Sequence, residues 1–127
     1  MKALSLKQPW ATLIVAGTKP IENRTWASNY RGPLLIHASK TWDEDGACWI
    51  IHHFPELTGL IRHSKHIKGA IIGKVKMTDC VSEFNSKWFF GPYGFVLTKP
   101  KLFDKPIPYK GQLGIFDIPD EVIFRTE

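Results

Sequence analysis

The sequence contains little cysteine and no long apolar run. Only two of its 127 residues, Cys48 and Cys80, are cysteines, and they do not form a C-x-x-C pair. This argues against a disulfide framework or a structural zinc site and predicts reduced thiols in an intracellular, cytoplasmic protein. No stretch approaches the roughly 20 apolar residues of a membrane span. The amino-terminal residues become polar at Lys7-Gln8-Pro9, so we expect neither a signal peptide nor a membrane partner.

Acidic residues are also outnumbered. Seventeen Lys and Arg residues against 12 Asp and Glu give a net charge of +5 and a pI near 9.3. Such a balance favours attraction to polyanions, although an ordinary basic surface explains it equally well. The hydrophobic share of 43% and charged share of 23% are typical of a globular protein. Without repeats or a linker, residues 1–127 are predicted to form a single domain.

The hydropathy pattern predicts an α+β fold that is mainly β, a small barrel with flanking short helices. One helix is expected to begin at Pro9 and to end near Gly17, and a second to begin at the capping box Thr41–Glu44. The stretch 55–68 is interpreted as a loop or a short helix. The expected strands cover 2–6, 21–26, 34–38, 70–79, 94–97 and 114–118, with edge or irregular strands near 102–103 and 107.

The segment between Ser5 and Trp26 carries the densest chemistry. Lys19, Glu22 and Arg24 lie within six positions, and on a strand Glu22, Arg24 and Trp26 share one face. Arg24 is suited to bidentate contact with a phosphate or a base edge. A lysine close to an arginine has a less favourable ammonium form, which suits a base. The alternative is that Glu22 and Arg24 only pair with cross-strand neighbours.

The same segment resembles the ASCH domain (activating signal cointegrator homology). Its signature Gly-x-Lys-x-x-Glu-x-Arg is matched by Gly17, Lys19, Glu22 and Arg24. Further similar blocks occur in order along nearly the whole chain, namely Ser5–Ala11, Arg31–Ala38, Gly69–Gly73, Phe90–Phe95 and Pro106–Gly111. The resemblance implies a PUA-like β-barrel with a cleft between the barrel and the first helix, lined by Lys19, Glu22 and Arg24.

The resemblance further implies association with RNA or DNA, of which RNA is favoured, or with a modified nucleoside. Some small family members are similar to amidohydrolases that deacylate N-acylated cytidine with a Lys, a Thr three residues later and a distant Glu. Lys19 matches the Lys, but Glu22 stands at the Thr position, and Glu83 is the best candidate for the distant Glu. This departure makes a binding domain the first hypothesis, with the amidohydrolase as its alternative.

A third hypothesis is a ribonuclease that uses Lys19, Glu22, Arg24 and His37. Further candidates for the cleft follow from chemistry. Phosphate-binding, stacking and substrate-contacting candidates are Ser5, Lys7, Gln8, Trp10, Trp26, Arg31 and His37. For Trp10, Trp26 and His37 the alternative is a place in the core, which an apolar helix face favours for Trp10 and which is the commoner role of a lone histidine such as His37.

The close histidine pairs, including His63-x-x-His66, lack further donors at ligand spacing, so we expect no metal and no cofactor. The chain is predicted to act as a monomer.

Overall fold

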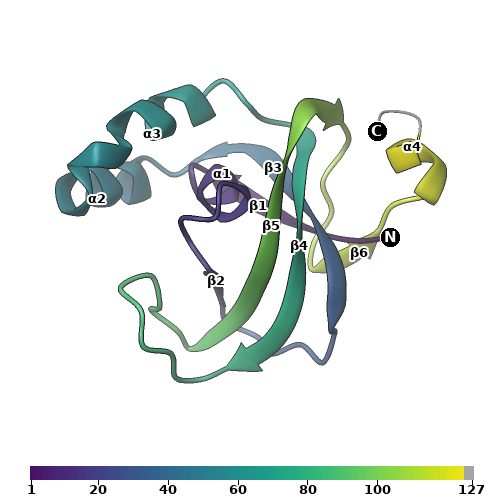
Figure 1. Ribbon diagram of the computed structural model, residues 1–127, viewed down its shortest axis with the longest axis horizontal. Helices are drawn as coiled ribbons and strands as arrows, with labels where there is room; N and C mark the ends of the chain where they lie inside the picture. The colour runs from purple at the N-terminus through teal and green to yellow at the C-terminus, as the bar shows by residue number, and fades with distance from the viewer. Residues whose placement is uncertain (125–127) are drawn as a thin grey trace.

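The computed structural model of the protein describes residues 1–124 and forms one six-stranded sheet with short helices around it (Figure 1). The elements follow the chain as β1 (Lys2–Gln8), α1 (Trp10–Val15), β2 (Ile21–Arg24), β3 (Gly32–Trp42), α2 (Glu44–His53), the 3₁₀ turn η1 (Pro55–Leu57), α3 (Thr58–Ser64), β4 (Ala70–Val81), β5 (Tyr93–Pro108), β6 (Ile115–Asp117) and α4 (Asp120–Phe124). No helix among residues 1–124 is both long and apolar enough to cross a membrane.

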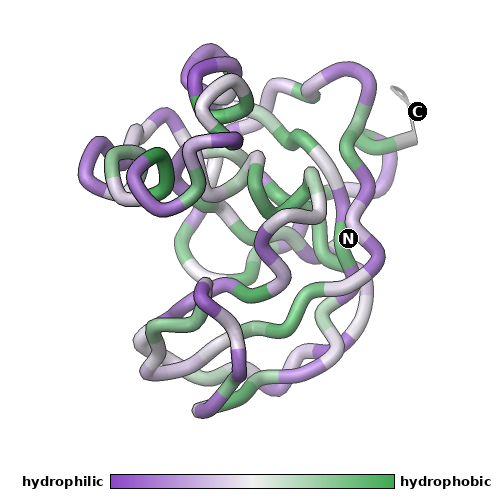
Figure 2. Tube along the Cα trace, turned by 60° about the vertical axis from the view of Figure 1, so that its left-hand side comes forward, coloured by the Kyte–Doolittle hydropathy of each residue, from purple (hydrophilic) through white to green (hydrophobic). Residues whose placement is uncertain are grey.

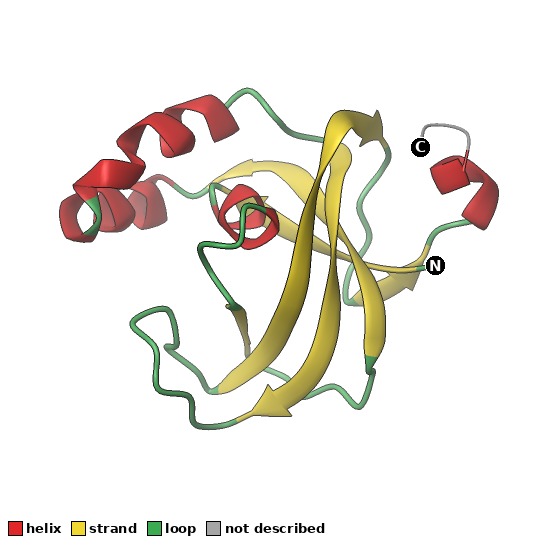
Figure 3. Ribbon diagram, in the orientation of Figure 1, coloured by secondary structure: helices red, strands yellow, loops and turns green. Residues whose placement is uncertain are grey.

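The strand order is β2-β5-β4-β3-β1-β6. β1 and β3 run parallel, with Ser5 opposite His37, and the other neighbouring strands are antiparallel. The mainly β class with short helices is confirmed. The predicted barrel does not close, because β2 and β6 are the two ends of the described sheet. Figure 3 shows the long, strongly twisted strands curving past α1.

The largest of the three described hydrophobic clusters lies between the sheet and α1. Ile14 and Val15 of α1 pack with buried side chains of β1, β3, β4 and β5, among them Leu4, Leu34 and Phe95. Figure 2 shows hydrophobic segments running through the middle of the molecule, with hydrophilic segments mostly at its periphery. This packing fixes α1 against the strands, and the first cavity described below opens beside it.

Several boundaries differ from the prediction. β2 ends at Arg24, so Trp26 follows the strand and does not lie on it, and β1 and β3 are longer than expected. The α2 helix is capped by Asp43, whose Oδ1 accepts a hydrogen bond from Gly46 N at 2.9 Å, whereas Thr41 still belongs to β3. The stretches 94–97, 102–103 and 107 form a single strand, β5. β2 pairs only with residues 93–96 of β5. Beyond residue 96, β5 is an edge strand on that side, so the missing N–H groups of its prolines cost little.

Candidate functional site

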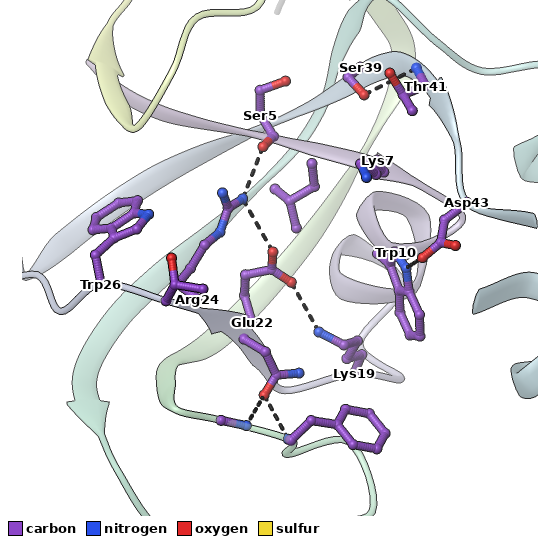
Figure 4. A pocket seen from close by; sticks show the side chains of 15 residues that line it. Ser5, Lys7, Trp10, Lys19, Glu22, Arg24, Trp26, Ser39, Thr41 and Asp43 are labelled. Carbon is purple, nitrogen blue, oxygen red and sulfur yellow. Dashed lines mark hydrogen bonds and ion pairs between the residues drawn. The ribbon is translucent and has the colours of Figure 1, made fainter. Parts of the chain in front are cut away.

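A cavity of about 570 Å³ opens beside β1, α1 and β2; it is called the first cavity below (Figure 4). Its lining residues are Ser5, Leu6, Lys7, Trp10, Lys19, Glu22, Asn23, Arg24, Thr25, Trp26, Ser39, Thr41, Asp43, Phe90 and Gly91. Seven of the predicted site residues are among them. These are Ser5, Lys7, Trp10, Lys19, Glu22, Arg24 and Trp26. The structure therefore brings together residues that lie 21 positions apart in the chain.

The turn that ends α1 places Lys19 in the wall of the first cavity. Gly17 adopts a left-handed conformation with φ of 85°, and the N–H groups of Gly17 and Thr18 donate to Ile14 O and Leu13 O. This is a Schellman turn, which glycine favours because it has no Cβ. The Lys19 N–H also donates to Leu13 O, at 3.1 Å. The turn thus folds the chain back, and the Lys19 Nζ lies 5.4 Å from the centre of the Trp10 ring.

Lys19, Glu22 and Arg24 form a row of ion pairs along the wall of the first cavity. The Lys19 Nζ lies 3.1 Å from Glu22 Oε1, and the Arg24 Nη2 lies 3.2 Å from Glu22 Oε2. Glu22 and Arg24 share one face of β2, as the sequence predicts, and the Glu22 side chain is only 12% exposed. Figure 4 shows Trp26 and Trp10 at opposite ends of this row.

Lys19 is the most deeply buried charged residue of the row. Its side chain is 2% exposed, and its Nζ donates hydrogen bonds to Ile21 O and Glu22 Oε1. Burial lowers the pKa of Lys19 below its ordinary value; the charge and hydrogen bond of Glu22 oppose this shift, and the nearby Arg24 adds to it. Lys19 thus combines a lowered pKa with a carboxylate in contact, which suits proton transfer or the positioning of Glu22.

Arg24 connects the row to β1. Its Nη2 donates to the Ser5 carbonyl oxygen at 3.0 Å, and its guanidinium lies 6.0 Å from the Trp26 ring centre. The Arg24 Nε is buried and has no hydrogen-bond partner among the described residues.

Trp10, at the other end of the row from Trp26, is held in place by Asp43. Its Nε1 donates to Asp43 Oδ2 at 2.8 Å. Burial raises the pKa of Asp43, but hydrogen bonds from Trp10 and Gly46 and the charge of Lys7 outweigh it, so the pKa is lowered overall. A Cβ at Gly46 would lie 2.6 Å from the Trp10 ring, so glycine is needed there for the indole to fit. Trp10 is half-buried and presents part of its surface to the cavity.

Sequence reasoning missed Asp43 and Asn23. Asn23 lies between two signature residues, and it orders the loop that forms one rim of the cavity. Its Nδ2 donates to Trp88 O, and its Oδ1 accepts from the N–H groups of Phe90 and Gly91 at 2.8 and 3.1 Å. The available signal was its position beside Glu22 and Arg24, but the loop it holds lies 65 residues away in sequence.

Gln8 and Arg31 do not line the first cavity. Gln8 is 2% exposed, and its side-chain amide is used within the fold: Nε2 donates to Thr12 Oγ1 and Ile67 O, and Oε1 accepts from Thr12 N. Arg31 lies in an exposed turn, where it donates to the carbonyl oxygens of Ser28 and Tyr30 and lies 3.7 Å from Asp79. Both residues therefore have structural partners.

Glu83 and His37 also lie apart from the row. Glu83 is exposed after β4 and lines neither described cavity. His37 is 2% exposed and lines a second cavity of about 710 Å³ on the other side of Ser5, with Ser39, Lys40, Gly69, Tyr109, Lys110, Gly111, Gln112 and Leu113. The amidohydrolase set with Glu83, and the ribonuclease set with His37, are thus not assembled in the first cavity.

Metal ligands do not gather in the part of the chain that the structure describes. Residues 1–124 contain no group of three or more His, Cys, Asp or Glu side chains that could hold an ion. Among the described residues that line the first cavity, the carboxylates are those of Glu22 and Asp43, and both make the contacts given above. The arrangement is instead one of fixed donors, acceptors and aromatic rings.

The family model of the ASCH domain matches residues 4–112. The chain belongs to the ASCH family. All residues that line the first cavity lie within this match. The resemblance noted in the sequence is thereby confirmed, and the open sheet with short helices is compatible with a PUA-like fold.

Two curated relatives have the same name. Activating signal cointegrator 1 of Homo sapiens is 26% identical over 130 residues, and that of Mus musculus is 25% identical over 130 residues. Each alignment covers 94% of this ASCH chain and 22% of the relative. The chain therefore spans about a fifth of the length of the curated relatives it matches.

Solved ASCH structures share the fold. The crystal structure of ASCH from Zymomonas mobilis has a TM-score of 0.63 at 13% identity and covers 98% of this chain and 91% of that chain. A single-site mutant of the Zymomonas mobilis protein has a TM-score of 0.62 at 14% identity, with 98% and 94% covered. At these identities the likeness establishes the fold.

Proposed function

We propose that this ASCH domain binds nucleic acid, with RNA favoured over DNA, or a modified nucleoside, in the first cavity. The observation that carries this proposal is the row Lys19–Glu22–Arg24 between two tryptophans in a space of about 570 Å³. That volume falls within the roughly 300–1,000 Å³ typical of ligand sites. Aromatic faces and fixed polar groups are the two elements with which proteins recognise unpaired bases.

Each residue of the row has a distinct role in this proposal. Arg24 donates to a base edge or a phosphate oxygen. Glu22 accepts from a base amino group, since carboxylate oxygens that already accept one hydrogen bond keep further capacity. Lys19 is too deeply buried to reach a phosphate, so it positions Glu22. This assignment departs from the sequence expectation that Lys19 contacts the phosphate; exposed Lys7 at the rim takes that place.

The test is binding of a labelled single-stranded RNA of about ten nucleotides, followed by fluorescence anisotropy. We expect Arg24→Gln to weaken binding by about tenfold to a hundredfold, because the variant cannot form the charge-assisted hydrogen bond. Arg31→Gln is the matched control, since it removes the same charge outside the cavity. Equal losses in the two variants would contradict the proposal. Lys7→Gln repeats the test at an exposed cavity residue if Arg24→Gln does not fold.

A second candidate function is the hydrolysis of an N-acylated cytidine. It is favoured by one observation, the buried Lys19 with its lowered pKa beside Glu22. In this reaction a water molecule attacks the acyl carbon, and the Lys19–Glu22 pair takes a proton from it and delivers a proton to the exocyclic nitrogen as the C–N bond breaks, so that cytidine and the free acid leave. Arg24 stabilises the oxyanion that develops on the acyl oxygen. The Thr of the amidohydrolase pattern is absent, because Glu22 occupies its position.

Mass spectrometry of the protein incubated with N4-acetylcytidine separates the two functions. Hydrolysis predicts released cytidine that disappears in Glu22→Gln, whereas the binding function predicts an unchanged substrate. The same incubation with the labelled RNA tests the ribonuclease hypothesis through the appearance of shorter fragments.

A further inference from the structure

The two cavities meet at Ser5 and Ser39, which line both of them. The Ser5 carbonyl oxygen accepts from Arg24 in the first cavity, whereas the Ser5 Oγ lies 2.8 Å from His37 Nδ1 on the side of the second. Figure 4 shows the carbonyl oxygen directed toward Arg24 and the hydroxyl directed away from it. The chain at Ser5 is therefore a narrow ridge with a ligand-sized space on each side.

The second cavity is a formed site because a buried polar side chain holds its wall. His37 is 2% exposed, and its Nε2 lies 2.6 Å from Tyr109 O. A carbonyl oxygen only accepts, so Nε2 donates, and in the neutral imidazole Nδ1 accepts from the Ser5 hydroxyl. The Tyr109 N–H also donates to Gly69 O at 3.1 Å. These bonds fix the loop after β5 beside Ser5 and His37, which face each other in the middle of β1 and β3.

Gly111 makes this loop fit closely. A Cβ at Gly111 would lie 2.9 Å from Ser5 Oγ and 2.8 Å from His37 Cε1. Contacts this short exclude a larger side chain unless the loop moves. The loop backbone thus lies directly against the Ser5–His37 pair and forms part of the wall of the second cavity.

The charges of the two cavities differ. The described lining of the first contains Lys7, Lys19 and Arg24 but also Glu22 and Asp43. The described lining of the second contains Lys40 and Lys110, both exposed, and no Asp or Glu. The second cavity is therefore the more favourable of the two for a phosphate, since no carboxylate opposes its lysines.

We propose that the second cavity binds the neighbouring nucleotide of a single strand whose first nucleotide occupies the first cavity. The strand crosses the ridge at Ser5 and Ser39, and Lys40 and Lys110 contact the phosphate that follows the crossing. This inference rests on the proposed function and makes it specific: the ligand is a single-stranded oligonucleotide rather than a free nucleoside.

The experiment is competition against the labelled RNA by cytidine 5′-monophosphate and by a cytidine dinucleotide. The mononucleotide carries more negative charge than the dinucleotide, so a preference for the dinucleotide does not arise from charge. We expect the dinucleotide to compete about tenfold better. In the double variant Lys40→Ala, Lys110→Ala this preference should fall to near unity, because the dinucleotide loses the contacts of its phosphate with the second cavity.

The double variant Lys76→Ala, Lys105→Ala is the matched control. It removes the same charge from exposed positions outside both cavities. Salt dependence gives a second measure, namely the slope of the logarithm of the binding constant against the logarithm of the salt concentration. For the labelled RNA, the magnitude of this slope should decrease by about 0.7 for each phosphate that the Lys40→Ala, Lys110→Ala variant no longer neutralises. The slope of the control variant should stay closer to that of the wild type.

Equal competition by the two nucleotides, with RNA binding intact, overturns the second subsite and leaves the proposed function standing. Equal losses in the cavity and control variants also overturn it, since surface charge then explains the effect. If the wild-type protein retains neither the RNA nor the mononucleotide, the proposed function fails, and the inference fails with it.

Discussion

Glu22 is the residue on which the wall of the first cavity depends, because its two oxygens hold a cation each. Replacement by Gln leaves buried Lys19 without a counter-charge. We expect Glu22→Gln to lower the free energy of unfolding by about 2–4 kcal/mol. Breaking a fully buried ion pair costs roughly 3–5 kcal/mol, and the loss expected here is smaller because Arg24 is partly exposed. Urea denaturation measures this loss. Asp117→Asn breaks the exposed pair with Lys2 and should change stability little; comparable losses would refute the role of Glu22.

The pH dependence of stability tests the environment of Lys19. Burial lowers its pKa in the folded state, whereas the unfolded chain keeps the ordinary value of 10.5. Between these two values the unfolded state binds more protons, so the contribution of Lys19 to stability rises with pH. We predict that wild type gains stability relative to Lys19→Met as pH rises from the lowered pKa toward 10.5. Parallel curves in urea denaturation at stepped pH would show that Lys19 titrates normally.

At the scale of elements, the loop 88–91 depends on one strand residue. Asn23→Ala removes the hydrogen bonds to Trp88 O, Phe90 N and Gly91 N. We expect faster amide hydrogen exchange at Phe90 and Gly91, while β4 and β5 keep their protection, because the loop loses its anchor and the sheet does not. Unchanged exchange in the loop would show that packing of Trp88 holds it without Asn23.

The elements also show what could be predicted from the sequence. The Gly17 turn and the face shared by Glu22 and Arg24 follow from local chemistry, and the structure contains both. The continuity of β5 was missed, because its prolines suggest breaks unless the short extent of β2 is known. His37 and Arg31 are candidates for the cleft on their chemistry alone. Their actual places depend on long-range pairing, such as the contact of His37 with Tyr109.

At the scale of the whole molecule, the five tryptophans report where a ligand binds. Trp10 and Trp26 line the first cavity, whereas Trp42, Trp49 and Trp88 line neither cavity. Trp42 lies beside Lys65, and Trp49 packs against Trp88. A ligand held by surface charge alone, for example near the basic stretch 62–68, would affect a different set of indoles from a ligand in the first cavity.

The most direct test of binding in the first cavity is a titration of the ¹⁵N-labelled protein with single-stranded RNA, followed through the five indole N–H resonances. We predict that the resonances of Trp10 and Trp26 shift and saturate together, while that of Trp42 stays in place; Trp88 packs against Trp10, and Trp49 against the cavity residue Phe90, so smaller shifts at these two indoles are expected. Shifts at Trp42 or Trp49 without shifts at Trp10 and Trp26 would contradict this site, because the nucleic acid would then bind outside the cavity of Lys19, Glu22 and Arg24.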